Sequence, residues 1–70
     1  MDIITKIRIM QAVRNVNETE TAELIGTSRQ NFSKKIKRDN IGIDTIEFIA
    51  NALGFDMEIV FTDRETGKKI

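Results

Sequence analysis

The sequence predicts a mainly α-helical domain of four short helices, followed by a C-terminal β-hairpin or strand. Apolar residues recur at spacings of three and four as far as Leu53, as on one face of a helix. Residues that favour helix ends separate these apolar segments. After Gly54 the period changes to two, which is typical of a strand. We therefore divide the chain into a helical domain over 1–54 and a hairpin over 55–70.

The first two helices are predicted from their caps and apolar stripes. Asp2 is a good N-cap for the first helix, and Asn17 with Glu20 forms a capping-box pattern for the second, which begins at about residue 18. Gly26 follows the second helix where positive φ is favoured. The first stripe consists of Ile3, Ile4, Ile7, Met10, Val13 and Val16. The second consists of Ala22, Leu24 and Ile25.

The third predicted helix runs from about Arg29 to Arg38, with Thr27 and Ser28 supplying its cap. Its apolar residues are only Phe32 and Ile36, one pair at i, i+4. A single narrow edge can therefore face a core, and nearly all of this helix points outward. The outward residues are Arg29, Gln30, Asn31, Ser33, Lys34, Lys35 and Lys37.

A fourth helix is predicted after the loop that ends near Gly42. Asp44 with Glu47 repeats the capping-box pattern, and Ile43 is placed to pack on Phe48 as a hydrophobic staple. Gly54 closes this helix. Its core stripe is Ile46, Ile49, Ala50 and Leu53.

The segment FDMEIVFT after Gly54 alternates like a strand, and the turn DRETG follows, with Gly67 where positive φ is favoured. Lys68 to Ile70 can form a short return strand. A lone hairpin is barely stable in water, so it must dock on the helices or pair with another copy. We expect a dimer interface; the alternative is that the hairpin only covers its own core. The expected interface residues are Phe55, Met57, Ile59 and Phe61.

Composition excludes several classes of function. The chain has no cysteine and no histidine, which removes disulfides, thiolate or His-based catalysis and the usual zinc ligands. Seventy residues are too few to build a water-excluding pocket easily, so we expect no enzyme, metal, cofactor or small-molecule ligand. The apolar runs are far shorter than the roughly 20 residues needed to span a bilayer. We expect a cytoplasmic protein without membrane contact.

Charge is balanced in total but segregated along the chain. Lysine and arginine number 11, as do aspartate and glutamate. Residues 29–38 carry five cations and no acid, whereas the segment after Gly54 is mostly acidic until Glu65. We expect one positive face and one negative face.

The stretch beginning at Asn17 resembles the helix-turn-helix of the Xre family of Cro-like and lambda-repressor-like DNA-binding domains. The resemblance covers about residues 3–54. Two positions depart from the family pattern: Glu18 stands where a phosphate-contacting glutamine is common, and Thr21 stands where leucine is usual. The matching positions are Ala22, the Leu24-Ile25-Gly26 turn, Ser28 as cap, Phe32 as buried anchor, and Ile43 to Leu53 as the closing helix.

The third helix also suits double-stranded DNA on physical grounds. An α-helix fits the major groove, where arginine matches guanine and glutamine or asparagine matches adenine. A cationic helix is more often only a solvated surface, but the caps and the amide-rich leading end favour DNA contact. The expected base-reading residues are Arg29, Gln30, Ser33 and Lys34. The expected backbone contacts are Thr19, Thr27, Ser28, Asn31, Lys35, Lys37 and Arg38.

These features predict a sequence-specific transcriptional regulator, acting as a homodimeric repressor on a palindromic operator. One recognition helix reads few base pairs, and two copies would read two half-sites about one helical turn apart. The alternatives are an antitoxin or adaptor, whose C-terminal segment binds another protein, and an interaction module that uses the fold without DNA.

Overall fold

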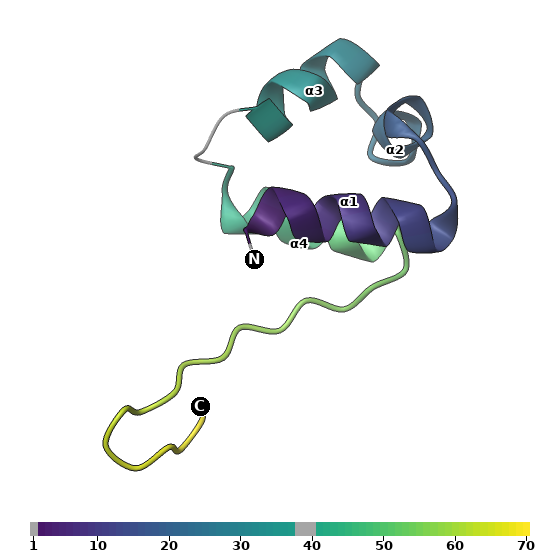
Figure 1. The fold of residues 1–70 in the computed structure, drawn as a ribbon. Coiled ribbons are helices and arrows are strands. Elements are labelled where there is room, and N and C mark those ends of the chain that lie inside the picture. The colour runs from purple at the N-terminus through teal and green to yellow at the C-terminus, as the bar shows by residue number, and fades with distance from the viewer. Residues whose placement is uncertain (1, 38–40) are drawn as a thin grey trace.

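The computed structural model describes residues 2–37 and 41–70, and this part of the chain contains four helices (Figure 1). They are α1 (Ile3–Arg14), α2 (Glu18–Leu24), α3 (Arg29–Lys37) and α4 (Ile43–Ala52). α1 and α4 lie side by side, and α2 and α3 pack on each other to one side of that pair. The mainly α architecture with four helices agrees with the sequence prediction.

All four helices contribute to one hydrophobic core. Phe32 and Ile36 are buried, so α3 is held through the apolar pair that its sequence predicts. Ala22 of α2 is buried as well, and its small side chain allows α2 and α3 to approach closely. The other buried apolar residues are Ile7, Ile49, Ala50 and Leu53.

Three predicted helix starts have the expected hydrogen bonds. Asp2 Oδ1 accepts from Thr5 N at 2.8 Å. Asn17 Oδ1 accepts from Glu20 N at 2.8 Å, while Asn17 N donates to Glu20 Oε1 at 3.2 Å, which completes the capping box. Ser28 Oγ accepts from Asn31 N at 3.1 Å. These contacts satisfy amides that a helix start otherwise leaves without partners.

The predicted capping box of α4 is wrong. The N-cap is Gly42, which makes no side-chain cap, and Asp44 lies inside the first turn. The helix begins earlier than the Asp44 to Glu47 spacing suggested. Asp44 still places a negative charge near the N-terminus, where the helix dipole favours it.

Two residues assigned to the apolar stripes are exposed: Val13 at 59% and Leu24 at 55%. Gln11 and Thr21 are buried instead, at 5% and 0% exposure. They satisfy each other, because Gln11 Nε2 donates to Thr21 Oγ1 at 2.9 Å. A hydrogen-bonded polar pair, which the predicted apolar stripes did not include, thus lies buried between α1 and α2.

The C-terminal segment (residues 55–70) leaves the helical body in an extended conformation and turns back at its end (Figure 1). The described residues contain no strand, so the predicted hairpin is not formed as a pair of strands. An isolated antiparallel bridge joins Thr62 to Lys69, and Phe61 and Ile70 exchange two backbone hydrogen bonds of 2.9 Å. Gly67 has φ +75°, as the turn requires.

No strand forms over residues 56–60 because these residues have no pairing partner within the part of the chain that the structure describes. No backbone hydrogen bond joins them to another residue of the described chain. The segment also extends the molecule: the radius of gyration is 13.9 Å, compared with roughly 11 Å for a compact domain of this length. Within residues 2–37 and 41–70, no helix is long and apolar enough to cross a membrane.

Candidate nucleic-acid interface

α3 is positioned by a tight turn and by two buried side chains. Gly26 adopts φ +75° in that turn, a left-handed conformation that glycine tolerates without strain. Ser28 then caps α3 by accepting from Asn31 N. Phe32 and Ile36 anchor one edge of the helix in the core, so its remaining circumference faces outward.

The four residues predicted to read bases lie together on that outward side. Arg29, Gln30 and Lys34 are exposed, and Ser33 is half-buried. All four line one hollow of about 560 Å³. Glu18 and Lys37 complete its lining. This surface is polar and carries three of the chain's cations, so it could hold an anionic or hydrogen-bonding ligand.

The residues predicted to contact the DNA backbone are more dispersed. Thr27, Asn31 and Lys35 line a second hollow of about 230 Å³, which shares Lys34 with the first. Thr19 is exposed on α2, and Lys37 lines the first hollow. The Ser28 side chain is engaged as the α3 cap, so its hydroxyl is already a hydrogen-bond partner of Asn31 N. Arg38 lies outside the described residues.

Glu18 is the acidic residue at the rim of this surface. Its Oε1 lies 2.6 Å from Arg8 Nη2, and its Oε2 accepts from Ser33 Oγ at 3.0 Å and lies 3.8 Å from Arg29 Nε. The hydrogen bond from Arg8 is the main cause that lowers the pKa of the Glu18 carboxyl, although burial opposes it. Glu18 is therefore ionised on a surface that is otherwise cationic.

The sequence identified Glu18 as a departure from the family pattern, at a position where a phosphate-contacting glutamine is common, but it did not predict the contacts of Glu18. Its partners are ten residues upstream in Arg8 and 11 and 15 residues downstream in Arg29 and Ser33. No helical period links such positions, so only the crossing of α1, α2 and α3 brings them together. Arg8 is fixed in turn by Gln11, whose Oε1 accepts from Arg8 Nη1 at 3.2 Å.

The predicted dimer-interface residues divide into two pairs. Phe55 is half-buried; its backbone N donates to Ala50 O at 2.8 Å, and the guanidinium carbon of Arg14 lies 4.3 Å from its ring centroid. Met57 is also half-buried. The other pair is exposed, with Ile59 at 53% and Phe61 at 67%.

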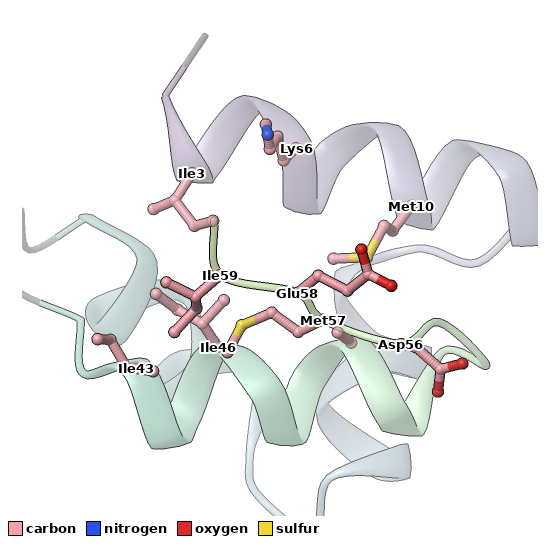
Figure 2. Close-up of a pocket in the computed structure, with 10 residues that line it drawn as sticks. Ile3, Lys6, Met10, Ile43, Ile46, Asp56, Met57, Glu58 and Ile59 are labelled. Atoms are coloured by element: carbon pink, nitrogen blue, oxygen red, sulfur yellow. The ribbon is translucent and has the colours of Figure 1, made fainter. Parts of the chain in front are cut away.

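Met57 and Ile59 border an apolar groove between the C-terminal segment and the α1–α4 pair (Figure 2). Its volume is about 420 Å³. Figure 2 shows Ile3 of α1 and Ile46 of α4 on opposite sides of Ile59, whereas the Asp56 carboxylate points away from them. Residues 56–59 therefore form one side of the groove, and side chains of α1 and α4 form the rest.

Within the described part of the chain, no three acidic side chains gather where they could hold a metal ion. No protein-family model, no curated protein and no solved structure matches this chain.

Proposed function

We propose that this chain is a sequence-specific DNA-binding transcriptional regulator, with a helix-turn-helix of the lambda-repressor-like, Xre type formed by α2 and α3. One observation carries the proposal: the buried residues of α3 are Phe32 and Ile36, while its cationic and amide-bearing side is largely exposed. A helix presented in this way matches the width of the major groove and the donors and acceptors of base edges.

The proposed roles follow from side-chain chemistry and position. Arg29 and Gln30 stand at the leading end of α3, where a recognition helix enters the groove, and they suit guanine and adenine. Ser33 and Lys34 lie one turn further on and extend the base-reading surface. Lys35 and Lys37 would contact phosphates of the DNA backbone, and such contacts supply affinity without sequence preference.

The same proposal includes a homodimer formed by the C-terminal segment. Residues 56–60 are extended and have no backbone partner in the described chain, which is the condition in which a second strand can be added. Ile59, Val60 and Phe61 add apolar surface that is more than half exposed. Pairing of two such segments would bury this surface and would place two copies of α3 on a palindromic operator, where the dimer represses by occlusion.

An antitoxin or adaptor is the second candidate, because the same unpaired segment could bind a different protein by strand addition. Light scattering after size exclusion separates the two. A dimer of the lone chain supports the homodimeric regulator. A monomer whose C-terminal segment captures a partner supports the adaptor.

The DNA role is tested with alanine variants on α3. Arg29→Ala and Gln30→Ala should each relax the preference for particular base pairs, by about 1–3 kcal/mol per bidentate contact. Lys37→Ala should weaken all duplexes alike and reduce the salt slope by about one unit. Fluorescence anisotropy with labelled duplexes over a salt series measures both effects.

Lys6→Ala is the matched control, since it removes the same charge from α1, where Lys6 lines the groove of Figure 2 and not the hollow on α3. It should leave sequence preference unchanged. A selected sequence that is unaltered by Arg29→Ala would contradict the base-reading assignment. Absence of binding to any duplex at low salt would contradict the function itself.

A further inference from the structure

Glu18 joins three helices at the rim of the proposed DNA surface. It is the first residue of α2, and it contacts Arg8 of α1 at 2.6 Å. On α3 it accepts a hydrogen bond from Ser33 and lies 3.8 Å from Arg29. One carboxylate thus contacts two of the four side chains proposed to read bases.

The effect of the Glu18–Arg29 contact depends on which guanidinium nitrogen of Arg29 faces the carboxylate. Glu18 approaches Nε, on the stem side of the guanidinium. Guanine is recognised by two N–H groups presented as a fork, and a carboxylate beside Nε leaves the terminal amino groups available for it. Because the Arg29 side chain is otherwise 67% exposed, Glu18 restricts a side chain that has many other orientations open to it.

Ser33 is constrained by the same carboxylate. Its hydroxyl has a single hydrogen, which it donates to Glu18 Oε2 at 3.0 Å. Ser33 can then meet a base edge only as an acceptor. Arg8 holds the carboxylate from the other side at 2.6 Å, so its position does not depend on Arg29.

We infer that Glu18 is a positioning residue that orients Arg29 toward guanine and so sets the preference at that base pair. This inference rests on the proposed DNA-binding function. The ion pair is worth little in water, but a duplex that covers the hollow would lower the local dielectric and strengthen it. The negative charge also repels phosphates, so Glu18 lowers the affinity for all sequences while it raises discrimination among them.

Glu18→Gln tests this inference: the amide oxygen can still accept from Arg8, whereas the NH2 group then faces Ser33 and Arg29, so the charge that attracts Arg29 is gone and Ser33 can only accept from this side chain. Anisotropy is measured on the duplex selected by the wild type, on the same duplex with the Arg29-dependent base pair exchanged, and on a mixed-sequence duplex. Discrimination between the first two should fall roughly fivefold. Binding to the mixed-sequence duplex should become tighter.

Two further variants isolate the effect. Glu23→Gln removes the same charge from α2 and should leave discrimination as in the wild type. In an Arg29→Ala background, Glu18→Gln should change discrimination no further. Glu18→Asp keeps the charge but shortens the side chain, and it should lower discrimination without tightening mixed-sequence binding, which provides a second reading if the glutamine variant folds poorly.

Each contrary result has a distinct meaning. If both Glu18 variants bound all three duplexes more weakly by the same factor, Glu18 would have only a structural role. If both bound all three more tightly by the same factor, Glu18 would only repel the phosphates. Either result overturns the inference. A wild type that binds no duplex at low salt overturns the proposed function. A wild type that selects a site, and keeps its discrimination when Glu18 is changed, contradicts only the role of Glu18.

Discussion

At the scale of single residues, the α1–α2 contact depends on a buried polar pair. Thr21 Oγ1 accepts from Gln11 Nε2 at 2.9 Å and donates to Asn17 O at 2.8 Å. Burying polar groups is tolerable only because each has its partner. The pair therefore fixes how α2 sits on α1, and α2 in turn carries α3.

Thr21→Val should lower the free energy of unfolding by about 1–3 kcal/mol, because it leaves the buried Gln11 amide without its acceptor while hardly changing shape. Urea denaturation measures the change. Thr19→Val is the matched control on the exposed side of α2 and should stay within about 0.5 kcal/mol of the wild type. Equal effects at both positions would show that the hydrogen bond contributes nothing.

The pH dependence of stability should carry the signature of Glu18. Its pKa in the folded protein is lowered, chiefly by the hydrogen bond from Arg8 and also by that from Ser33. Its contribution is therefore complete above the unfolded pKa of about 4.3 and is lost as pH falls through the lower folded pKa. Stability should decline in that acidic range, and Glu18→Gln should flatten the decline.

Arg8→Gln should flatten the same curve, because Arg8 is the main cause of the shift. Some slope should remain in both variants, since the Thr5 backbone amide lowers the pKa of Asp2 in the same direction. Thermal unfolding followed by circular dichroism between about pH 3 and 6 measures these slopes. A Glu18→Gln curve that runs parallel to the wild type would rule out this linkage.

At the scale of helices and segments, the sequence predicted those elements whose signals are local. α1, α2 and α3 begin where their caps indicated, and Phe32 and Ile36 are the anchors of α3. The predicted start of α4 is wrong because Asp44, a good N-cap residue by type, lies in the first turn instead, where the helix dipole also favours an acid.

Contacts between residues of different helices could not be predicted from the sequence, because they depend on how the helices cross. The contacts of Glu18 with Arg8, Ser33 and Arg29 have no periodic signature. The alternation of residues 55–61 is typical of a strand, but it does not identify a second segment with which that strand could pair. The residues of the candidate surface could thus be chosen from sequence, whereas their mutual constraints could not.

Arg14 sets where the C-terminal segment leaves the helices. Its Nε donates to Leu53 O at 2.7 Å and its Nη2 to Gly54 O at 3.1 Å, while its guanidinium stacks on Phe55. Arg14→Ala should lower stability by about 1–2 kcal/mol, through loss of the cation–π contact and of a charge at the α4 C-terminus. It should also speed hydrogen exchange at the Phe55 amide.

Arg14→Lys keeps the charge but not the planar fork, so it should restore only part of that stability. Denaturant unfolding gives the stability change, and exchange measured by NMR gives the local one. If Arg14→Ala left both quantities at their wild-type values, Arg14 would not hold the segment.

At the scale of the whole molecule, the C-terminal segment is the basis of the proposed homodimer. Ile59, Val60, Phe61 and Ile70 are all more than half exposed, and residues 56–60 have no backbone partner within the described chain. Such a segment in a small domain favours association. A homodimer would complete both the apolar surface and the backbone pairing.

We predict that the chain elutes as a dimer, at twice its mass of 8.0 kDa, and that Phe61→Ser shifts it toward the monomer. The apolar surface of Phe61 is 67% exposed in one copy and would be covered in two. Val13→Ser, an equivalent change at a 59% exposed site on α1, should leave the dimer intact. Light scattering after size exclusion measures the molar mass of each variant, and a monomeric wild type would contradict the predicted dimer.

The most direct test of the central claim, that the outward side of α3 enters a duplex groove, is selection of bound duplexes from a random library at low salt. We predict enrichment of a twofold-symmetric motif whose half-sites lie about 10 base pairs apart, centre to centre. Arg29→Ala should blur specified positions in that motif. Sequencing that finds no enriched motif after repeated rounds would contradict the claim.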